Sequence, residues 1–162
     1  MQRGPVRLSS HRAPFPLPAA HRHGDKETLM AVDPTGADLK RMLAEDPGGP
    51  VVMLNLLRFA PGGRPSYEEY ARRLRERFLE RYGAEVLYAG DGTTPLVAED
   101  GQAWDAVLLV RYPSREAFSR MVADPEYQRV TALRTRALAE AVLQPTVPWP
   151  ASGEGEGDRA VS

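Results

Sequence analysis

The chain has 162 residues, of which 42% are hydrophobic, enough for one hydrophobic core and little more. Its 21 Lys and Arg residues nearly balance its 22 Asp and Glu residues, and the formal net charge of −1 provides no field that would attract nucleic acid or an anionic membrane. We therefore expect neither as a partner. Because the sequence has no cysteine, disulfides, thiolate nucleophiles, iron–sulfur clusters and cysteine-based zinc sites are excluded.

The two ends of the chain differ in composition from its middle. Residues 1–29 are rich in Pro and contain all three His residues, with no spacing of apolar residues that could bury one face. Residues 149–162 are rich in Gly and acidic residues. We predict a folded domain at 30–148 between two disordered segments. No stretch reaches the roughly 18 consecutive apolar residues of a spanning helix or resembles a secretory signal, so we expect a cytoplasmic protein.

The domain is predicted to begin with a helix, a strand and a second helix. Asp33-Pro34-Thr35 is typical of a helix start, and a Pro-Gly-Gly-Pro segment ends that helix. An apolar strand is predicted at 51–59. Ser66 and Glu69 have the spacing of a capping box, which predicts a helix that begins there and ends at Gly83.

Further strands and helices complete the predicted domain. Turn residues and apolar runs predict extended segments at 85–89, 95–98 and 104–112. Ser114 caps a short helix, and Asp124-Pro125 begins another whose apolar face extends to Leu138. A last short strand at 143–147 can close the sheet.

The predicted order of strands and helices is that of the split βαβ, or ferredoxin-like, arrangement, an α+β fold with its helices on one side of an antiparallel sheet. The strands at 51–59 and 104–112 are apolar on both faces, whereas a sheet with one face in water alternates apolar and polar residues. A second copy of the sheet would cover the second face in a two-fold homodimer. In the alternative, the N-terminal helix covers that face of a monomer.

Several ordered blocks of sequence carry a resemblance to a known family. They are the strand at 51–59, the helix start at 66–70, the strand at 86–90, and the run 104–114 followed by Met121, Asp124-Pro125 and Tyr127. Across residues 30–148 they resemble the domain-of-unknown-function family 1330. The resemblance implies a dimeric α+β barrel with a cavity between sheet and helices in each subunit. That superfamily includes cofactor-free monooxygenases, lactone isomerases, haem-degrading enzymes and stress-response binders, and analogy of fold does not choose among them.

Polar residues on the two long strands are candidate ligand-binding residues. Asn55 is the one amide in an apolar strand, so it bonds either a ligand or a neighbouring backbone group. Arg58 and Arg111 occupy equivalent places in a repeated pattern, an apolar strand that ends in Arg and an aromatic residue. Two guanidinium groups there could hold a carboxylate or an enolate. Alternatively, each pairs with an acid of the protein, such as Asp105 or Glu69.

Aromatic residues complete the set of candidates. Tyr67 and Tyr70 lie on the inner face of their predicted helix, and as general acids they would need a pKa lowered by an adjacent Arg. Trp104 could form one wall of a site for an aromatic ligand, or anchor the core or a dimer interface.

The absence of His from residues 30–150 removes the usual general base, haem ligand and metal ligand. We therefore expect neither a metal nor a cofactor. The first of three hypotheses is a cavity that binds a small hydrophobic acidic or phenolic molecule, with or without cofactor-independent proton transfer or oxygenation. The second is a non-catalytic dimeric module whose apolar sheet face serves only assembly. The third, haem handling, is disfavoured by the missing His. The sequence does not decide whether the protein is an enzyme.

Overall fold

The computed structural model describes residues 31–150, so the predicted extension 1–29 and residues 151–162 of the predicted tail lie outside the described residues. In chain order its elements are α1 (Gly36–Ala44), β1 (Val51–Phe59), α2 (Arg64–Arg77), β2 (Glu85–Asp91), β3 (Ala106–Tyr112), α3 (Arg115–Ala123), α4 (Pro125–Ala137) and β4 (Leu138–Thr146). Within 31–150, each helix is too short or too polar to cross a lipid bilayer.

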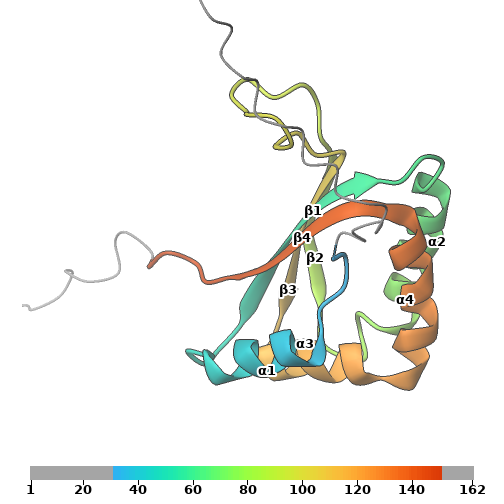
Figure 1. Ribbon diagram of the computed structural model, residues 1–162. Coiled ribbons are helices and arrows are strands. Elements are labelled where there is room, and N and C mark those ends of the chain that lie inside the picture. Colours follow the sequence, from blue (N-terminus) through green and yellow to red (C-terminus); the bar gives the residue numbers. More distant parts are fainter. Residues whose placement is uncertain (1–30, 151–162) are drawn as a thin grey trace, which may run out of the picture.

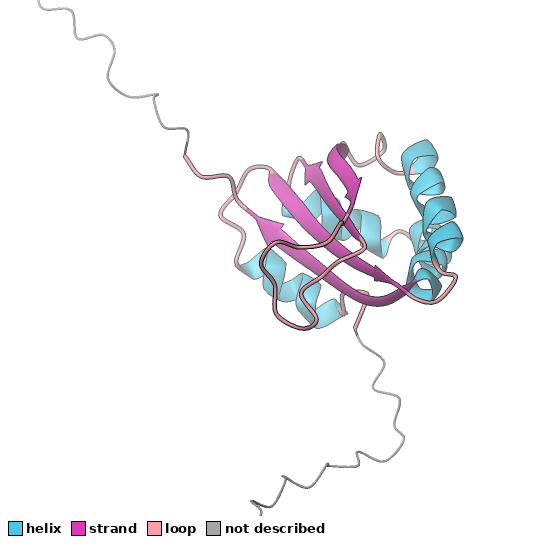
Figure 2. Ribbon diagram, turned by 90° about the horizontal axis from the view of Figure 1, so that it is seen from above, coloured by secondary structure: helices cyan, strands magenta, loops and turns pink. Residues whose placement is uncertain are grey.

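The four strands form one antiparallel sheet in the order β2-β3-β1-β4. Figure 2 shows these strands side by side, and Figure 1 shows the helices gathered on one side of them. α2 and α4 lie next to each other in that layer, and α1 lies beside α3. The predicted α+β ferredoxin-like fold is therefore confirmed.

The core lies between the sheet and the helices. Val51, Met53 and Leu57 point into it from alternate positions of β1, as the two-residue period of a strand requires. The aromatic ring of Phe78, just after α2, and the side chain of Met121 from α3 are also fully buried there. Apolar residues at helical spacing thus cover one face of an apolar strand.

The start of α2 differs from the predicted capping box. The helix begins at Arg64, after Gly63 as N-cap, and Ser66 lies inside it with its hydroxyl donating to Leu133 O at 2.8 Å. A Cβ at position 63 would lie 2.2 Å from Ala137 O, so the absent side chain allows the start of α2 to approach the end of α4 closely. A Pro in the first turn can also begin a helix without any side-chain cap.

The bounds of the later strands differ from the sequence prediction as well. Residues 92–105 form a long loop, so the predicted extended segment at 95–98 is wrong, and β3 begins at Ala106 rather than at 104. β4 begins at Leu138, directly after α4, and not at 143. Hydrophobic spacing could not place this boundary, because Leu138 fits both the apolar face of a helix and a buried strand position.

The N-terminal helix forms as predicted, but on the same side of the sheet as the other helices. Thr35 caps α1 and forms a capping box with Asp38. α1 packs beside α3, where the guanidinium of Arg115 donates to Met42 O at 3.1 Å. The alternative in which this helix covers the second face of the sheet is therefore wrong.

The second face of the sheet carries an apolar patch, as its sequence predicts, although the register also places Arg111, Gln144 and Thr146 on this face. It presents half-buried side chains from the three strands β1, β3 and β4, which are Val52, Leu54, Leu56, Val107, Leu109 and Val142. No helix among residues 31–150 lies over this face, which is turned to the left in Figure 1. We call this surface the open face.

Candidate functional site

A cavity of about 350 Å³ lies between the sheet and the layer formed by α2, α3 and α4. Its walls are mostly apolar and include Leu74, Leu79, Leu108, Val110, Phe118, Met121 and Val122. A concave, mainly apolar space with a few polar groups is the usual form of a small-molecule site. The chemistry of the cavity is therefore set by the few polar side chains that reach it.

Arg134, on α4, is the charged group at the centre of this site, with only 4% of its surface exposed. Its Nη1 donates to Val32 O and to Asp33 Oδ1, the latter at 2.7 Å. The other oxygen of Asp33 accepts from Thr135 Oγ1 at 2.6 Å. Arg134 Nη2 is fully buried and has no hydrogen-bond partner among residues 31–150. Within this permanently charged guanidinium, Nη1 is thus hydrogen-bonded and Nη2 is not.

Four tyrosines surround the same cavity. The hydroxyls of Tyr70 and Tyr127 lie 2.9 Å apart and share a hydrogen bond. The rings of Tyr67 and Tyr70 are in contact, with centroids 5.5 Å apart. The hydroxyl groups of Tyr67 and Tyr112 make no hydrogen bond within the described residues, although both residues line the cavity. A ligand in the cavity would therefore meet several phenol groups.

Burial favours the protonated form of three of these phenols, those of Tyr67, Tyr70 and Tyr112. It raises the pKa of Tyr67 to about 12, even though the charge of Arg134 acts in the opposite direction. Burial also raises the pKa values of Tyr70 and Tyr112 above the ordinary tyrosine value. An adjacent Arg is present, as the general-acid hypothesis requires, but its lowering effect on the pKa of Tyr67 and Tyr70 is smaller than the raising effect of burial. Both tyrosines are hydrogen-bond donors at neutral pH.

Asn55 lies on the cavity side of β1, opposite Leu108 of β3 and Leu143 of β4. Its Nδ2 donates to Met53 O over a long 3.4 Å, which is its one side-chain hydrogen bond among residues 31–150. A bond of this length is weak. The amide can therefore also bind a group in the cavity.

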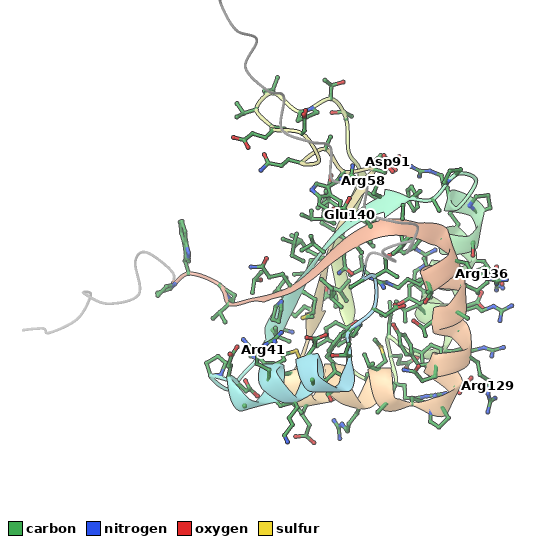
Figure 3. The ribbon with its side chains drawn as sticks, in the orientation of Figure 1. Arg41, Arg58, Asp91, Arg129, Arg136 and Glu140 are labelled. Carbon is green, nitrogen blue, oxygen red and sulfur yellow. The ribbon has the colours of Figure 1, made fainter. Side chains whose placement is uncertain are left out.

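Arg58 and Trp104 lie outside the cavity. Figure 3 shows Arg58 close to Glu140 at one end of the sheet, where Nε donates to Glu140 Oε2 at 2.9 Å. The guanidinium also donates to the carbonyls of Gly101 and Ala103 and lies 4.7 Å above the centre of the Trp104 ring. Arg58 is an anchor for the loop 92–105.

Arg111 lies outside the cavity too, and far from Arg58. It is exposed and pairs in register with Val52, six positions along β1 from Arg58. Six residues of strand extend for about 20 Å. Because the two strands are antiparallel, equivalent positions in them fall at opposite ends, and the two guanidinium groups cannot hold one carboxylate within a subunit.

The structure thus brings together Asn55, Tyr67 and Tyr70 and adds residues that sequence reasoning missed. Those are Asp33, Tyr112, Tyr127 and Arg134. A signal for Arg134 was present, because it follows Tyr127 by seven positions and Val130 by four, on the same face of α4. An Arg in an Arg-rich helix is normally assigned to the solvent face. Figure 3 shows this normal arrangement for Arg129 and Arg136, which point away from the sheet.

The cavity continues into an open groove between α2 and β2. The two spaces share Tyr67, Ala71, Arg75, Ala89 and Leu108. β2 is an exposed edge strand, and this groove offers a route from solvent to the cavity. Within residues 31–150, no group of three or more His, Cys, Asp or Glu side chains is arranged to hold a metal ion.

Comparison with other proteins places the chain among proteins of unknown function. Residues 60–144 match the family described as "Domain of unknown function (DUF1330)". A protein of unknown function from Rhodopseudomonas palustris, RPA0582, is 30% identical, with a TM-score of 0.68 over 75% of this chain and 99% of that one. The crystal structure of its methylated form has 29% identity and a TM-score of 0.67, over 79% and 99% of the two chains.

A more distant structure is a dabb family protein with a ferredoxin-like fold from Mesorhizobium loti. It is 8% identical, with a TM-score of 0.48 over 64% of this chain and 100% of that one. Comparison with curated proteins gives no match.

The raised pKa of Tyr67 predicts a loss of stability in alkaline solution. The folded state holds this proton more tightly than the unfolded state, so the stabilisation is complete below the ordinary value near 10 and is lost as the pH rises through about 12. We expect the free energy of unfolding of the wild type to fall by roughly 2 kcal/mol more than that of Tyr67→Phe between pH 9 and 12. Urea unfolding of both proteins at each pH measures this. Parallel curves for wild type and Tyr67→Phe would contradict the prediction.

Proposed function

The chain belongs to the DUF1330 family, a domain of unknown function, and we propose from its own side chains what it does. Each subunit binds a small, mainly apolar molecule with an acidic or phenolic oxygen in the cavity between sheet and helices. Two subunits associate through their open faces into a homodimeric α+β barrel. The proposal assigns binding and no reaction.

One observation carries the binding proposal, the buried and unpartnered Nη2 of Arg134. A buried donor on a charged group that lacks an acceptor costs free energy, typically about 1–3 kcal/mol or more. A ligand oxygen that accepts from Nη2 would remove this cost. Arg134 lines the cavity, but Nη2 itself has no accessible surface, so the contact requires the guanidinium to turn toward the bound molecule.

The remaining polar groups at the cavity support the same class of ligand. The phenols of Tyr67 and Tyr112 have hydrogen atoms to donate, and their raised pKa values keep them protonated. Asn55 offers an amide on the opposite wall. The apolar walls favour a hydrophobic body, and the donors favour one oxygen-bearing end.

A catalytic role for the tyrosines receives less support. A tyrosine that gives up its proton in a reaction at neutral pH needs a lowered pKa, and burial raises the pKa of Tyr67 and Tyr70. Donating a hydrogen bond without losing the proton is what such phenols do well. Binding is therefore the function that this geometry supports best.

The open face supports association with a second copy. Six apolar side chains gather there from three neighbouring strands, and no segment among residues 31–150 covers them. Apolar patches of this kind mark contact surfaces. Two identical sheets can bury such faces against each other about a two-fold axis. The ion pair of Arg58 and Glu140 would then lie at the polar edge of the interface.

Binding of a two-ring phenol, 2-naphthol, tests the site. We expect the wild type to bind it and Arg134→Met to bind it at least tenfold more weakly, because the buried donor is lost. Equilibrium dialysis measures both affinities. Arg136→Met, which removes an exposed Arg two residues along the same helix, is the control and should bind like the wild type. Failure of 2-naphthol to bind, or equal binding by Arg134→Met, would contradict the proposal.

The dimer has a separate test. Leu54 lies in the middle of the open face, and Leu54→Glu would place an unpaired charge in a buried interface. Sedimentation equilibrium at micromolar concentration should show a dimer for the wild type and a monomer for Leu54→Glu. Arg129→Glu, on the outer side of α4, should remain dimeric. A monomeric wild type would contradict the dimer. A wild type that is dimeric but binds no ligand would instead favour the alternative hypothesis, a non-catalytic dimeric module whose apolar sheet face serves only assembly.

A further inference from the structure

The charge of Arg134 is already neutralised inside the protein. Asp33, in the segment that precedes α1, holds Nη1 at 2.7 Å with one oxygen and accepts from Thr135 with the other. Asp33 itself lines the cavity next to Arg134. At the cavity wall, the buried guanidinium and this carboxylate, whose side chain is 33% exposed, therefore form a partly buried pair with no net charge.

This charge balance decides which ligand oxygen fits Nη2. A carboxylate bound there would place two negative charges around one positive charge and leave a net charge of −1 in a mostly apolar cavity, relieved only by the partial exposure of Asp33. Burial of an unbalanced charge is strongly unfavourable. A neutral carbonyl or phenol oxygen accepts the same hydrogen bond and leaves the pair balanced.

A second cation at the cavity, Arg75, does not change this balance. It lies on α2 where the cavity opens into the groove beside β2, and its side chain is exposed. A charge in contact with water is screened, and its pairing with a carboxylate contributes little. Tyr67, Tyr70 and Tyr112, whose pKa values are raised, and the amide of Asn55 add hydrogen-bonding groups without charge.

We infer that Asp33 is a specificity-determining residue that makes the cavity select a neutral carbonyl or phenol oxygen over a carboxylate on a ligand of the same shape. The inference rests on the proposed function, because it concerns the same cavity. Of the two ligand classes considered, phenolic and acidic, it selects the neutral one. It also assigns a role to the segment 31–35, which places the carboxylate of Asp33 next to Arg134 at the cavity.

Two probes of equal size separate these classes. In 2-acetylnaphthalene a methyl ketone stands where 2-naphthoate has its carboxylate, and the naphthoate is ionised at pH 7. We expect the wild type to bind the ketone at least tenfold more tightly in equilibrium dialysis, which corresponds to about 1.4 kcal/mol. Asp33→Asn leaves the site with one net positive charge, and its preference should shift toward the naphthoate by at least tenfold. Glu45→Gln, the same charge change at an exposed position after α1, should leave the wild-type ratio unaltered.

Different results would overturn this inference and the proposed binding function. Equal or tighter binding of the naphthoate by the wild type would overturn the inference and leave the binding site standing. A shift in Glu45→Gln as large as that in Asp33→Asn would also overturn it, because a general charge effect would then explain the preference. If Asp33→Asn does not fold, Asp33→Ser, which also removes the negative charge, takes its place and should show the same shift toward the naphthoate. If neither probe nor 2-naphthol binds, the proposed function itself fails.

Discussion

The buried guanidinium of Arg134 is the constraint on which the site depends. Arg keeps its charge at any physiological pH, so a chain that brings it into the interior must supply a counter-charge. That counter-charge, Asp33, lies 101 residues earlier in the sequence. The ion pair therefore ties the segment before α1 to α4 and helps to close the helical layer. It also leaves one buried donor of Arg134 without a partner, at the wall of a cavity that Tyr67, Tyr70 and Tyr112 line as well.

The two faces of the central strands have different roles in this arrangement. Along β1, Met53 and Leu57 pack under the helices, and Asn55 between them faces the cavity. The alternate side chains of the same strand form part of the open face. Apolar residues on both faces thus serve the core and ligand site on one side and the proposed dimer interface on the other. The ends of the strands are polar, and there Arg58 holds the loop 92–105 in place.

The sequence predicts the fold well because its signals are local and periodic. The two-residue period of β1 and the helical spacing of Tyr67 and Tyr70 place these residues on the correct faces. Asn55 stands out as a single amide in an apolar run. Where the pattern is ambiguous, as at Leu138, the boundary between helix and strand is missed. The start of α2 is missed because a close contact at Gly63 overrides the capping signal of Ser66.

The site is predicted only in part because its key contacts are not local. Arg58 and Arg111 look equivalent in sequence, yet the antiparallel register places them about 20 Å apart. Arg134 is one of many Arg residues on amphipathic helices, and its spacing from Tyr127 and Val130 indicates a buried face of α4 without indicating its pairing with the distant Asp33. No periodicity can reveal such a pair.

A double-mutant cycle on Asp33 and Arg134 tests the central claim most directly. Free energies of unfolding are measured in urea for the wild type, Asp33→Asn, Arg134→Met and the double variant. If the buried pair organises the site, each single change leaves a partner uncompensated, and the double variant loses less stability than the sum of the two by roughly 1 kcal/mol or more. Strict additivity of the two losses would show that the two side chains do not depend on each other and would contradict the account.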